Sequence, residues 1–313
     1  MEKIVTVTLN PAIDKSTTVP SIVPDKKLRC AEPKFEPGGG GVNVSRAIKR
    51  LGGNSTAIYM AGGYSGKYFK DLLNIEGIAS LVVEIEGQTR ENLIVVDRSA
   101  NLQYRFGMPG PLIKEDEWQK ALKFFGKSSG IEYIVASGSL PKGVPEDFFG
   151  RLAFVSKKIN ARLIVDTSGE PLRFAIKEGL FMIKPNLAEL SNLQGLEELR
   201  EDDVFKAAKD IITMGRCEVV VVSMGASGAM LVTRDGVVRS QSPIVKRRST
   251  VGAGDSMVAG MVLALSKGLT WSEVLQYEIA TGTATTMNPG TQLCIKEDVE
   301  RLYELLKAER DKL

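Results

Sequence analysis

The chain is 313 residues long, with 43% hydrophobic and 25% charged residues, which is ordinary for a soluble globular protein with a substantial core. The net charge is only +3, and lysines and arginines are scattered without interleaved aromatics, so nothing favours nucleic-acid binding. The chain contains no histidine, which excludes Ser–His and Cys–His catalytic pairs and histidine-ligated metal sites. Acid–base chemistry therefore falls to carboxylates, lysine, tyrosine or cysteine.

The sequence has no pattern that predicts secretion or membrane insertion. No run of 18 uninterrupted apolar residues is present, and Met1 is followed almost at once by a predicted strand. Cys30, Cys217 and Cys294 stand far apart without metal-ligand spacing, which is typical of reduced and buried thiols. We therefore expect a cytoplasmic protein without a membrane span.

Strands and helices alternate along most of the chain. The first strand is predicted at residues 4–9, and Asp14 follows it closely. Later strands are predicted at 55–60, 133–136, 163–165, 181–183 and 219–222, each followed by polar or glycine residues and a helical stretch. This pattern predicts a mostly parallel sheet with helices on both faces. Such sheets bind ligands at the carboxyl ends of their strands.

Two segments differ from this alternation and predict a separate small β-sheet. Short strands are predicted at 17–19, 28–35, 92–97 and 102–106, within segments of about 12–36 and 88–107. A small sheet of this kind fits a lid over a ligand, a rim at a dimer interface, or both. The remainder is interpreted as one domain, so that residues 1–313 form a single α/β domain with a lid.

Two glycine-rich stretches precede helical patterns. Residues 38–41 are four consecutive glycines, followed by Asn43 and by apolar residues at helical spacing up to Leu51. Residues 252–254 read Gly-Ala-Gly and lead into an apolar helical pattern that begins at about Gly254. A glycine turn at the start of a helix presents free N–H groups to an anion such as a phosphate. No GxGxxG sequence is present, so a dinucleotide-binding fold is disfavoured.

Asp255 is unusual at such an anion site, because a resting carboxylate repels a phosphate. Its presence is explained if it accepts a proton from a substrate hydroxyl while the amides of Gly252, Ala253 and Gly254 hold a transferring phosphoryl group. The alternative is that Asp255 only caps the helix, since Asp is common in first turns.

Three motifs together resemble the PfkB/ribokinase family of sugar kinases along nearly the whole chain. They are Gly-Gly-Gly-Gly-Val-Asn-Val at 38–44, Lys-Pro-Asn-Leu-Ala-Glu at 184–189 and Val-Gly-Ala-Gly-Asp-Ser at 251–256. Four further features resemble the sequences of the minor-type 6-phosphofructokinases, one branch of this family. They are Ser249 and residues 27–30, 103–106 and 290–294. The resemblance implies a ribokinase-like α/β fold and the ATP-dependent phosphorylation of fructose-6-phosphate at O1, with Asp255 as the general base. It also implies ATP and Mg²⁺ as cofactors.

The resemblance implies roles for further residues. The substrate side would comprise Asp14, Gly38, Gly39 and Asn43 for the sugar hydroxyls, Arg90, Arg105 and Ser139 for the existing phosphate, and Lys27 and Arg29 on the lid. The nucleotide side would comprise Lys184, Asn186, Glu189, Ser223, Gly225 and Thr283, with Glu189 holding Mg²⁺ through water. A monovalent-cation site, for an ion such as K⁺, would comprise Ser249, Val251, Thr285, Asn288, Gly290 and Gln292.

Several alternatives stay open at this point. Arg90 and Arg105 can be solvated surface residues, and Asn186 with Glu189 can form a helix capping box. A 1-phosphofructokinase or a tagatose-6-phosphate kinase would share the fold and the chemistry. A non-catalytic sugar-phosphate sensor is a remote alternative, because a binding protein has no use for a base inside its anion site. The lid strands favour a homodimer in which the two lids pair.

Overall fold

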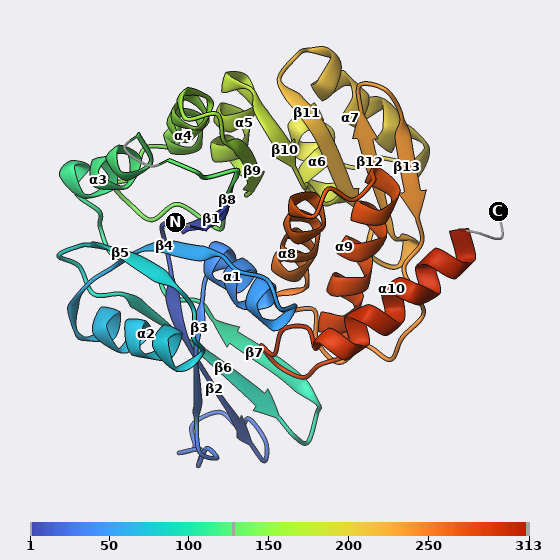
Figure 1. Cartoon of the computed structure of the whole chain (residues 1–313). Helices are drawn as coiled ribbons and strands as arrows, with labels where there is room; N and C mark the ends of the chain where they lie inside the picture. Colours follow the sequence, from blue (N-terminus) through green and yellow to red (C-terminus); the bar gives the residue numbers. More distant parts are fainter. Residues whose placement is uncertain (1, 127–128, 311–313) are drawn as a thin grey trace.

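The apolar runs predicted as strands form the centre of a nine-stranded sheet (Figure 1). The structure is a computed structural model that describes residues 2–126 and 129–310. The strand order is β13-β12-β11-β10-β9-β8-β1-β4-β5. The bounds are β1 Ile4–Thr8, β4 Thr56–Ala61, β5 Ser80–Glu84, β8 Tyr133–Ser137, β9 Arg162–Asp166, β10 Leu180–Ile183, β11 Cys217–Ser223, β12 Ala229–Thr233 and β13 Val237–Ser240. The strands from β11 to β5 are parallel, and β12 and β13 add an antiparallel edge.

Helices cover both faces of this sheet (Figure 1). One face carries α1 (Gly40–Arg50), α2 (Gly63–Ile75), α8 (Ala253–Ser266) and α9 (Trp271–Thr286), with α10 (Lys296–Arg310) against α9. The other face carries α3 (Glu115–Gly126), α4 (Phe148–Lys158), α5 (Gly169–Glu178), α6 (Leu187–Gln194) and α7 (Val204–Thr213). The 3₁₀ turns η1 and η2 span Glu201–Asp203 and Gly225–Ser227. In β8, Ile134 packs on one face and Val135 on the other, which explains why the strands are continuous apolar runs. No helix in the described ranges is long and apolar enough to cross a membrane.

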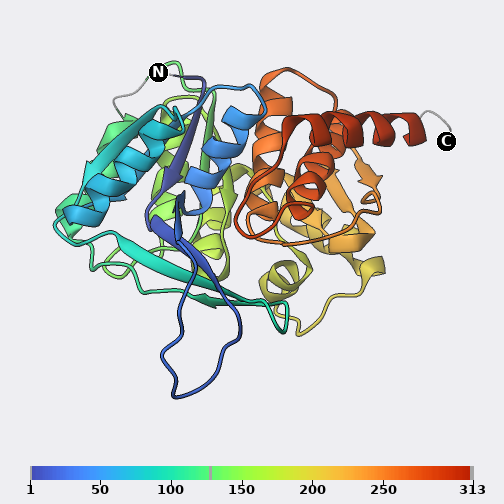
Figure 2. The same cartoon turned by 90° about the horizontal axis from the view of Figure 1, so that it is seen from below.

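A second sheet of four strands stands beside the main one (Figures 1 and 2). Its order is β3-β2-β6-β7, with bounds β2 Ala12–Val19, β3 Lys34–Gly38, β6 Arg90–Asp97 and β7 Leu102–Phe106. The central pair β2 and β6 is parallel, and both outer pairs are antiparallel. The predicted small sheet is therefore present, and we call it the lid.

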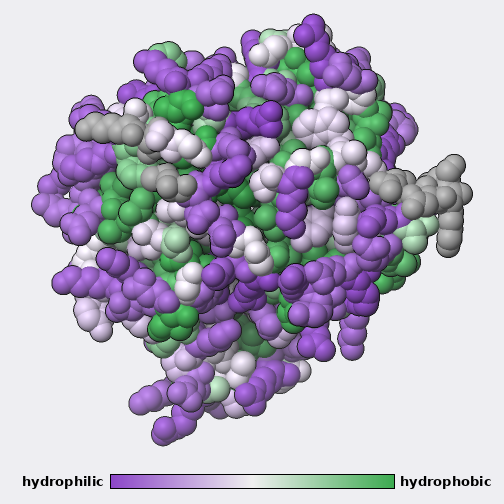
Figure 3. Space-filling view, in the orientation of Figure 1, coloured by the Kyte–Doolittle hydropathy of each residue, from purple (hydrophilic) through white to green (hydrophobic). Residues whose placement is uncertain are grey.

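The prediction of a strand at 28–35 is wrong for most of these residues. Residues 20–33 form a loop that extends away from the lid, and only the last two residues of the predicted strand belong to β3 (Figure 2). Pro33 cannot donate a ladder hydrogen bond, and the charged side chains of this loop are exposed, so no apolar face holds it on a sheet. Figure 3 shows hydrophilic residues at this tip, at the bottom of the view.

All three cysteines are free thiols, but only two of them are buried. Burial raises the pKa of Cys217 to about 12 and that of Cys294 to about 11, so both are inert at neutral pH. Cys30 is exposed on the loop 20–33, so the expected burial is wrong for this residue.

Candidate active site

The glycine motif at 252–254 forms the start of α8. Gly252 is the N-cap residue and has a left-handed conformation, with φ 71° and ψ 3°. A Cβ at this position would also lie 2.6 Å from Leu293 Cδ2, so glycine is required by both conformation and space. The predicted helix start is confirmed to within one residue. Ala253 N donates to the Thr250 carbonyl at 3.3 Å, a long bond, so the neighbouring amides are the more available ones.

The four-glycine run lets α1 approach the ends of β1 and β8. A Cβ on Gly40 would lie 2.3 Å from Ser137 Oγ, and one on Gly41 would lie 2.5 Å from the Val7 carbonyl oxygen. Because of this close approach, α1 begins at Gly40, inside the glycine run. Helices α1 and α8 then lie side by side (Figure 1). Asn43, in the first turn of α1, thereby reaches the start of α8.

Asp255 lies in the first turn of α8 and is surrounded by groups from several elements. Asn43 Nδ2 donates to Asp255 Oδ2 at 2.9 Å. Burial and the negative charge of Asp166 raise the pKa of Asp255 to about 6, although Asn43, Lys184 and Ser137 act in the opposite direction. A base with a pKa near the operating pH is suited to general-base catalysis.

Lys184 places a positive charge beside the glycine turn. Its side chain is 6% exposed, and its Nζ lies 3.3 Å from Asp166 Oδ1. Burial lowers the pKa of Lys184, but attraction to Asp166 and Glu278 outweighs this effect, so the pKa is raised and the ammonium stays charged. A Cβ on Gly254 would lie 3.8 Å from this Nζ, which shows how close the ammonium is to the anion site.

Asp166 and Ser137 were not predicted as site residues. Ser137 Oγ donates to Asp166 Oδ2 at 3.3 Å, and both residues are the last of their strands, β8 and β9. Their position in the sequence, directly after two apolar runs, could have indicated a role in the site. Polar residues at the carboxyl ends of parallel strands lie at the edge of the sheet where ligands bind.

A cleft of about 570 Å³ opens at this edge of the sheet. Its lining includes Ser139, Glu189 and Asp255, which the sequence assigned to three different roles. A larger hollow of about 1400 Å³ lies at the amino ends of β8 to β11 and is lined by no residue of the three motifs. The smaller cleft is therefore the candidate active site.

Asn186 and Glu189 form the capping box that was one of the two interpretations. Glu189 N donates to Asn186 Oδ1 and Asn186 N donates to Glu189 Oε2, both at 2.9 Å. Asn186 also pairs with Ser223 in an isolated parallel bridge, so these two nucleotide-side candidates are neighbours. Gly225 is exposed at the start of η2, and Thr283 is buried on α9.

Asp14 and Arg90 belong to the lid strands β2 and β6. Asn92 Nδ2 donates to Asp14 Oδ1 at 2.9 Å, and a Cβ on Gly38 would lie 2.2 Å from Asp14 Oδ2. Burial raises the pKa of Asp14, although Asn92 and Arg90 oppose this rise. Arg90 donates to the backbone carbonyls of Asn10 at 2.8 Å, Met108 at 3.2 Å and Pro11 at 3.4 Å. The interpretation of Arg90 as a solvated surface residue is therefore wrong.

Four of the other substrate-side candidates are exposed, and Gly39 is partly buried. Ser139 Oγ accepts a hydrogen bond from Asn10 Nδ2 at 3.2 Å, beside the cleft. Arg105 is exposed on β7, opposite Ile94 of β6, so the lid itself carries it. Lys27 and Arg29 are exposed on the loop 20–33. Gly39 has φ 111° and precedes α1.

The candidates for a monovalent-cation site come from the loop before α8 and from the end of α9 with the loop that follows it. Ser249 Oγ donates to the Gly290 carbonyl at 2.7 Å, and Val251 N donates to Ser249 Oγ at 3.2 Å. Asn288 Nδ2 donates to the carbonyls of Leu293 and Ala284 at 3.1 and 3.4 Å. The oxygens offered by the candidate set are backbone carbonyls and neutral side chains, which suit a monovalent cation. Within the described ranges, no group of three or more Cys, Asp or Glu residues could hold a metal ion by itself.

Comparisons with known proteins place these features in one family. Residues 1–298 match the family model for pfkB family carbohydrate kinases. The chain is 43% identical to the ATP-dependent 6-phosphofructokinase isozyme 2 of Escherichia coli (strain K12), over 98% of this chain and 99% of that protein. It is 33% identical to the 1-phosphofructokinase of Bacillus subtilis (strain 168), over 98% and 99% of the two chains.

Solved structures agree with this result. The crystal structure of phosphofructokinase-2 from Escherichia coli in complex with potassium has a TM-score of 0.94 and 43% identity, and covers 98% of this chain and 100% of that one. Ribokinase from Thermotoga maritima has a TM-score of 0.77 at 21% identity, over 97% of this chain and 100% of that one. This second likeness confirms the ribokinase-like fold.

Proposed function

The chain belongs to the pfkB family of carbohydrate kinases, and we propose that it is an ATP-dependent 6-phosphofructokinase, which converts fructose-6-phosphate to fructose-1,6-bisphosphate. The observation that supports this most is the place of Asp255. Its carboxylate lies in the first turn of α8, where a base and the amides of an anion site are held together. The higher identity to a 6-phosphofructokinase than to a 1-phosphofructokinase, 43% against 33%, supports the choice of sugar.

In the proposed reaction, Asp255 accepts the proton of the fructose-6-phosphate O1 hydroxyl. The O1–Pγ bond forms while the bond from Pγ to the bridging oxygen of ATP breaks, and ADP leaves with the electron pair. The amides of Gly252, Ala253 and Gly254 stabilise the negative charge on the transferring group, and Lys184 adds a positive charge beside them. Preorganised donors of this kind supply most of the rate enhancement in phosphoryl transfer.

The sugar phosphate would lie between the lid and the carboxyl edge of the main sheet. Asp14 and Asn43, with the backbone of Gly38 and Gly39, would hold the hydroxyl groups, because their polar atoms converge on this side. The phosphate would be held by Arg90, Arg105 and Ser139. Lys27 and Arg29, on the exposed loop 20–33, would reach either the phosphates or a neighbouring subunit. Arg90 is fixed by its three carbonyl partners, which prepares its remaining N–H groups for an anion.

The nucleotide would lie on the other side of Asp255. The residues on that side are Lys184, Asn186, Glu189, Ser223, Gly225 and Thr283. When bound, Mg²⁺ would neutralise the β- and γ-phosphates, and Glu189 would hold one of its waters. The capping box uses Glu189 Oε2, so Oε1 is the oxygen for that role. A potassium-type ion would be held by neutral oxygens from the loop before α8 and from the end of α9 with its following loop. The candidate residues are Ser249, Val251, Thr285, Asn288, Gly290 and Gln292.

Apolar side chains on the outer strand of the lid support a homodimer that forms through the lids. Leu102, Tyr104 and Phe106 of β7 are 54%, 38% and 48% exposed. Side chains of this size are seldom left grouped in water on a protein that stays monomeric. We infer that residues 1–313 fold as one domain, with the lid covering the substrate and pairing with a second lid.

The test of this function is a comparison of three sugar phosphates. We would measure kcat/KM with Mg-ATP for fructose-6-phosphate, fructose-1-phosphate and tagatose-6-phosphate. A clear preference for fructose-6-phosphate is expected. A preference for either of the other two sugar phosphates would leave the proposed mechanism unchanged but would show that the proposed substrate is wrong. Absence of turnover with all three, in folded protein, would contradict the function and favour a sugar-phosphate sensor.

A further inference from the structure

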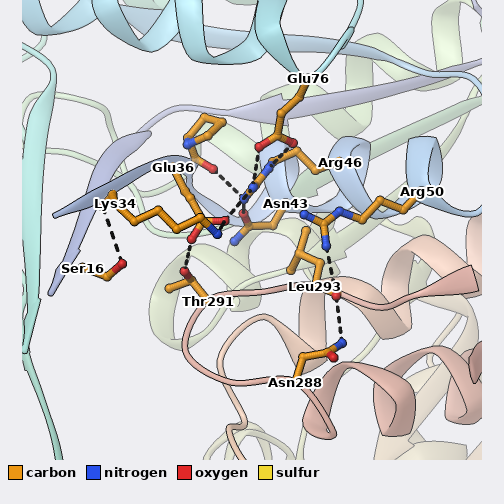
Figure 4. A network of polar contacts seen from close by, with 11 residues as sticks. Ser16, Lys34, Glu36, Asn43, Arg46, Arg50, Glu76, Asn288, Thr291 and Leu293 are labelled. Atoms are coloured by element: carbon orange, nitrogen blue, oxygen red, sulfur yellow. Dashed lines mark hydrogen bonds and ion pairs between the residues drawn. The ribbon is translucent and has the colours of Figure 1, made fainter. Parts of the chain in front are cut away.

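A buried arginine on α1 is held by two carboxylates (Figure 4). The side chain of Arg46 is only 2% exposed. Its Nε and Nη2 donate to Glu76 Oε2 and Oε1 at 2.7 and 2.6 Å, and Nη2 lies 3.3 Å from Glu36 Oε1. Paired hydrogen bonds of this kind fix the plane of a guanidinium as well as its position.

The remaining nitrogen of Arg46 faces the active site. Nη1 donates to the Pro37 carbonyl at 2.9 Å and to Asn43 Oδ1 at 3.4 Å. Because a guanidinium only donates hydrogen bonds, the oxygen of the Asn43 amide must face Arg46, and its NH₂ group must point the other way. That NH₂ group donates to Asp255 Oδ2 at 2.9 Å. Arg46 therefore selects the orientation in which Asn43 can stabilise a carboxylate.

The same cluster is anchored to the lid and to the C-terminal loop. Glu36 belongs to β3, two residues before the first glycine of the motif, and its Oε1 lies 3.0 Å from Lys34 Nζ. Glu36 Oε2 accepts a hydrogen bond from Thr291 Oγ1, two residues before the Leu293 side chain that packs on Gly252 (Figure 4). The lid strand is thus connected to the start of α8 on two sides.

We propose that Arg46 is a positioning residue for Asp255: it holds the Asn43 amide in its donating orientation and ties this pair to the lid strand β3. This inference rests on the proposed function, which makes Asp255 the base. The other groups that face Asp255 come from other elements, and they are Asp166 of β9, Lys184 after β10 and the hydroxyl of Ser137 in β8. A substitution at Arg46 leaves those groups in place, so its effect reports on Asn43.

The experiment is the pH profile of kcat/KM for Arg46→Lys. Lysine retains the positive charge but has no planar fork, so it cannot hold Glu76 and Asn43 at once. We expect the acid limb of the profile to move to higher pH by about 1 to 2 units, the size of one hydrogen bond to a carboxylate. Arg50→Lys is the matched control, because Arg50 lies one turn further along α1 and donates to the Leu293 carbonyl at 3.1 Å. Its acid limb should not move.

A folded Arg46→Lys variant with the wild-type acid limb would overturn the proposal. If that variant does not fold, Glu76→Ala takes its place, since the Glu76 side chain is 26% exposed and its loss frees two donors of Arg46. The limb should move in the same direction, and an unchanged limb would again overturn the proposal.

A second readout separates this proposal from the proposed function. The titration of the Asp255 carboxyl carbon in ¹³C-labelled protein, assigned by comparison with Asp255→Asn, needs no substrate. An upward shift of its midpoint in Arg46→Lys supports the positioning role even if the wild-type protein phosphorylates none of the three sugars. An unchanged midpoint in an active enzyme overturns the positioning role alone.

Discussion

The side-chain amide of Asn43 donates a hydrogen bond of 2.9 Å to the carboxylate of Asp255, although 212 positions separate the two residues in the chain. This contact joins the start of α1 to the start of α8, so the two glycine motifs form one site. It favours the ionised form of Asp255, against burial and the negative charge of Asp166, which favour the protonated form. The protonation state of Asp255 is therefore set by contacts between distant segments of the chain.

The pKa of Asp255 predicts the acid limb of the pH profile. With a pKa of about 6, the carboxylate becomes protonated as the pH falls below that value and can no longer accept a proton. We expect kcat/KM to fall about tenfold for each pH unit below the limb. Steady-state rates between pH 5 and 9 measure this, with circular dichroism to verify folding. A flat profile down to pH 5 would exclude Asp255 as the titrating base.

Gly252→Ala is expected to abolish most of the activity. The new Cβ would meet Leu293 Cδ2 at 2.6 Å, and φ of 71° is strained for alanine, so the turn that we propose as the anion site must move. Gly268→Ala is the matched control, because Gly268 also has φ 71° but its Cβ would meet open space. It should lose about 1 kcal/mol of stability with kcat unchanged. Equal kcat values for the two variants would show that the shape of the turn does not matter.

Because of Glu278, we expect the free energy of unfolding of the protein to depend on pH. It is buried on α9, and neither carboxylate oxygen has a hydrogen-bond partner among the described residues. Burial raises its pKa from 4.5 to about 8, while Lys184 opposes and Asp166 adds to this rise. Between these two values the folded chain binds the proton that the unfolded chain has released, so this carboxyl lowers the stability as the pH rises from 4.5 to 8.

Glu278→Gln stays neutral at every pH and tests this effect. We expect the variant and the wild type to have similar free energies of unfolding at pH 5, and the variant to be more stable by roughly 1 to 3 kcal/mol at pH 8. Urea denaturation at the two pH values gives the difference. Parallel pH dependences in the two proteins would mean that Glu278 does not titrate between them.

The outer strand of the lid predicts how the chain associates. Phe106→Asp places a charge on the exposed apolar strand β7, and we expect it to convert a dimer into a monomer. Phe154→Asp on α4 is the matched control, because Phe154 is 53% exposed against 48% for Phe106 but lies outside the lid. Sedimentation velocity measures the mass of each. If the wild type is monomeric, or if both variants stay dimeric, pairing through the lids is wrong.

The sequence predicted the parallel sheet, the lid and the glycine turns because these depend on local patterns. It did not predict Arg46, which reads as an ordinary polar position on an amphipathic helix. The burial of Arg46 depends on Glu36 and Glu76, which lie 10 and 30 positions away, and no local pattern specifies these partners. The strand predicted at 28–35 was wrong over residues 28–33, because a short β-favouring run forms a strand only where a neighbouring strand pairs with it.

The central claim is that Asp255 removes the proton from the sugar hydroxyl, and Asp255→Asn tests it most directly. The amide has the same shape, and its oxygen can still accept the hydrogen bond from Asn43, so the fold and the KM values should change little. We expect kcat with fructose-6-phosphate and Mg-ATP to fall by at least about 100-fold, the low end for loss of a general base. A folded variant with the wild-type kcat would contradict the mechanism.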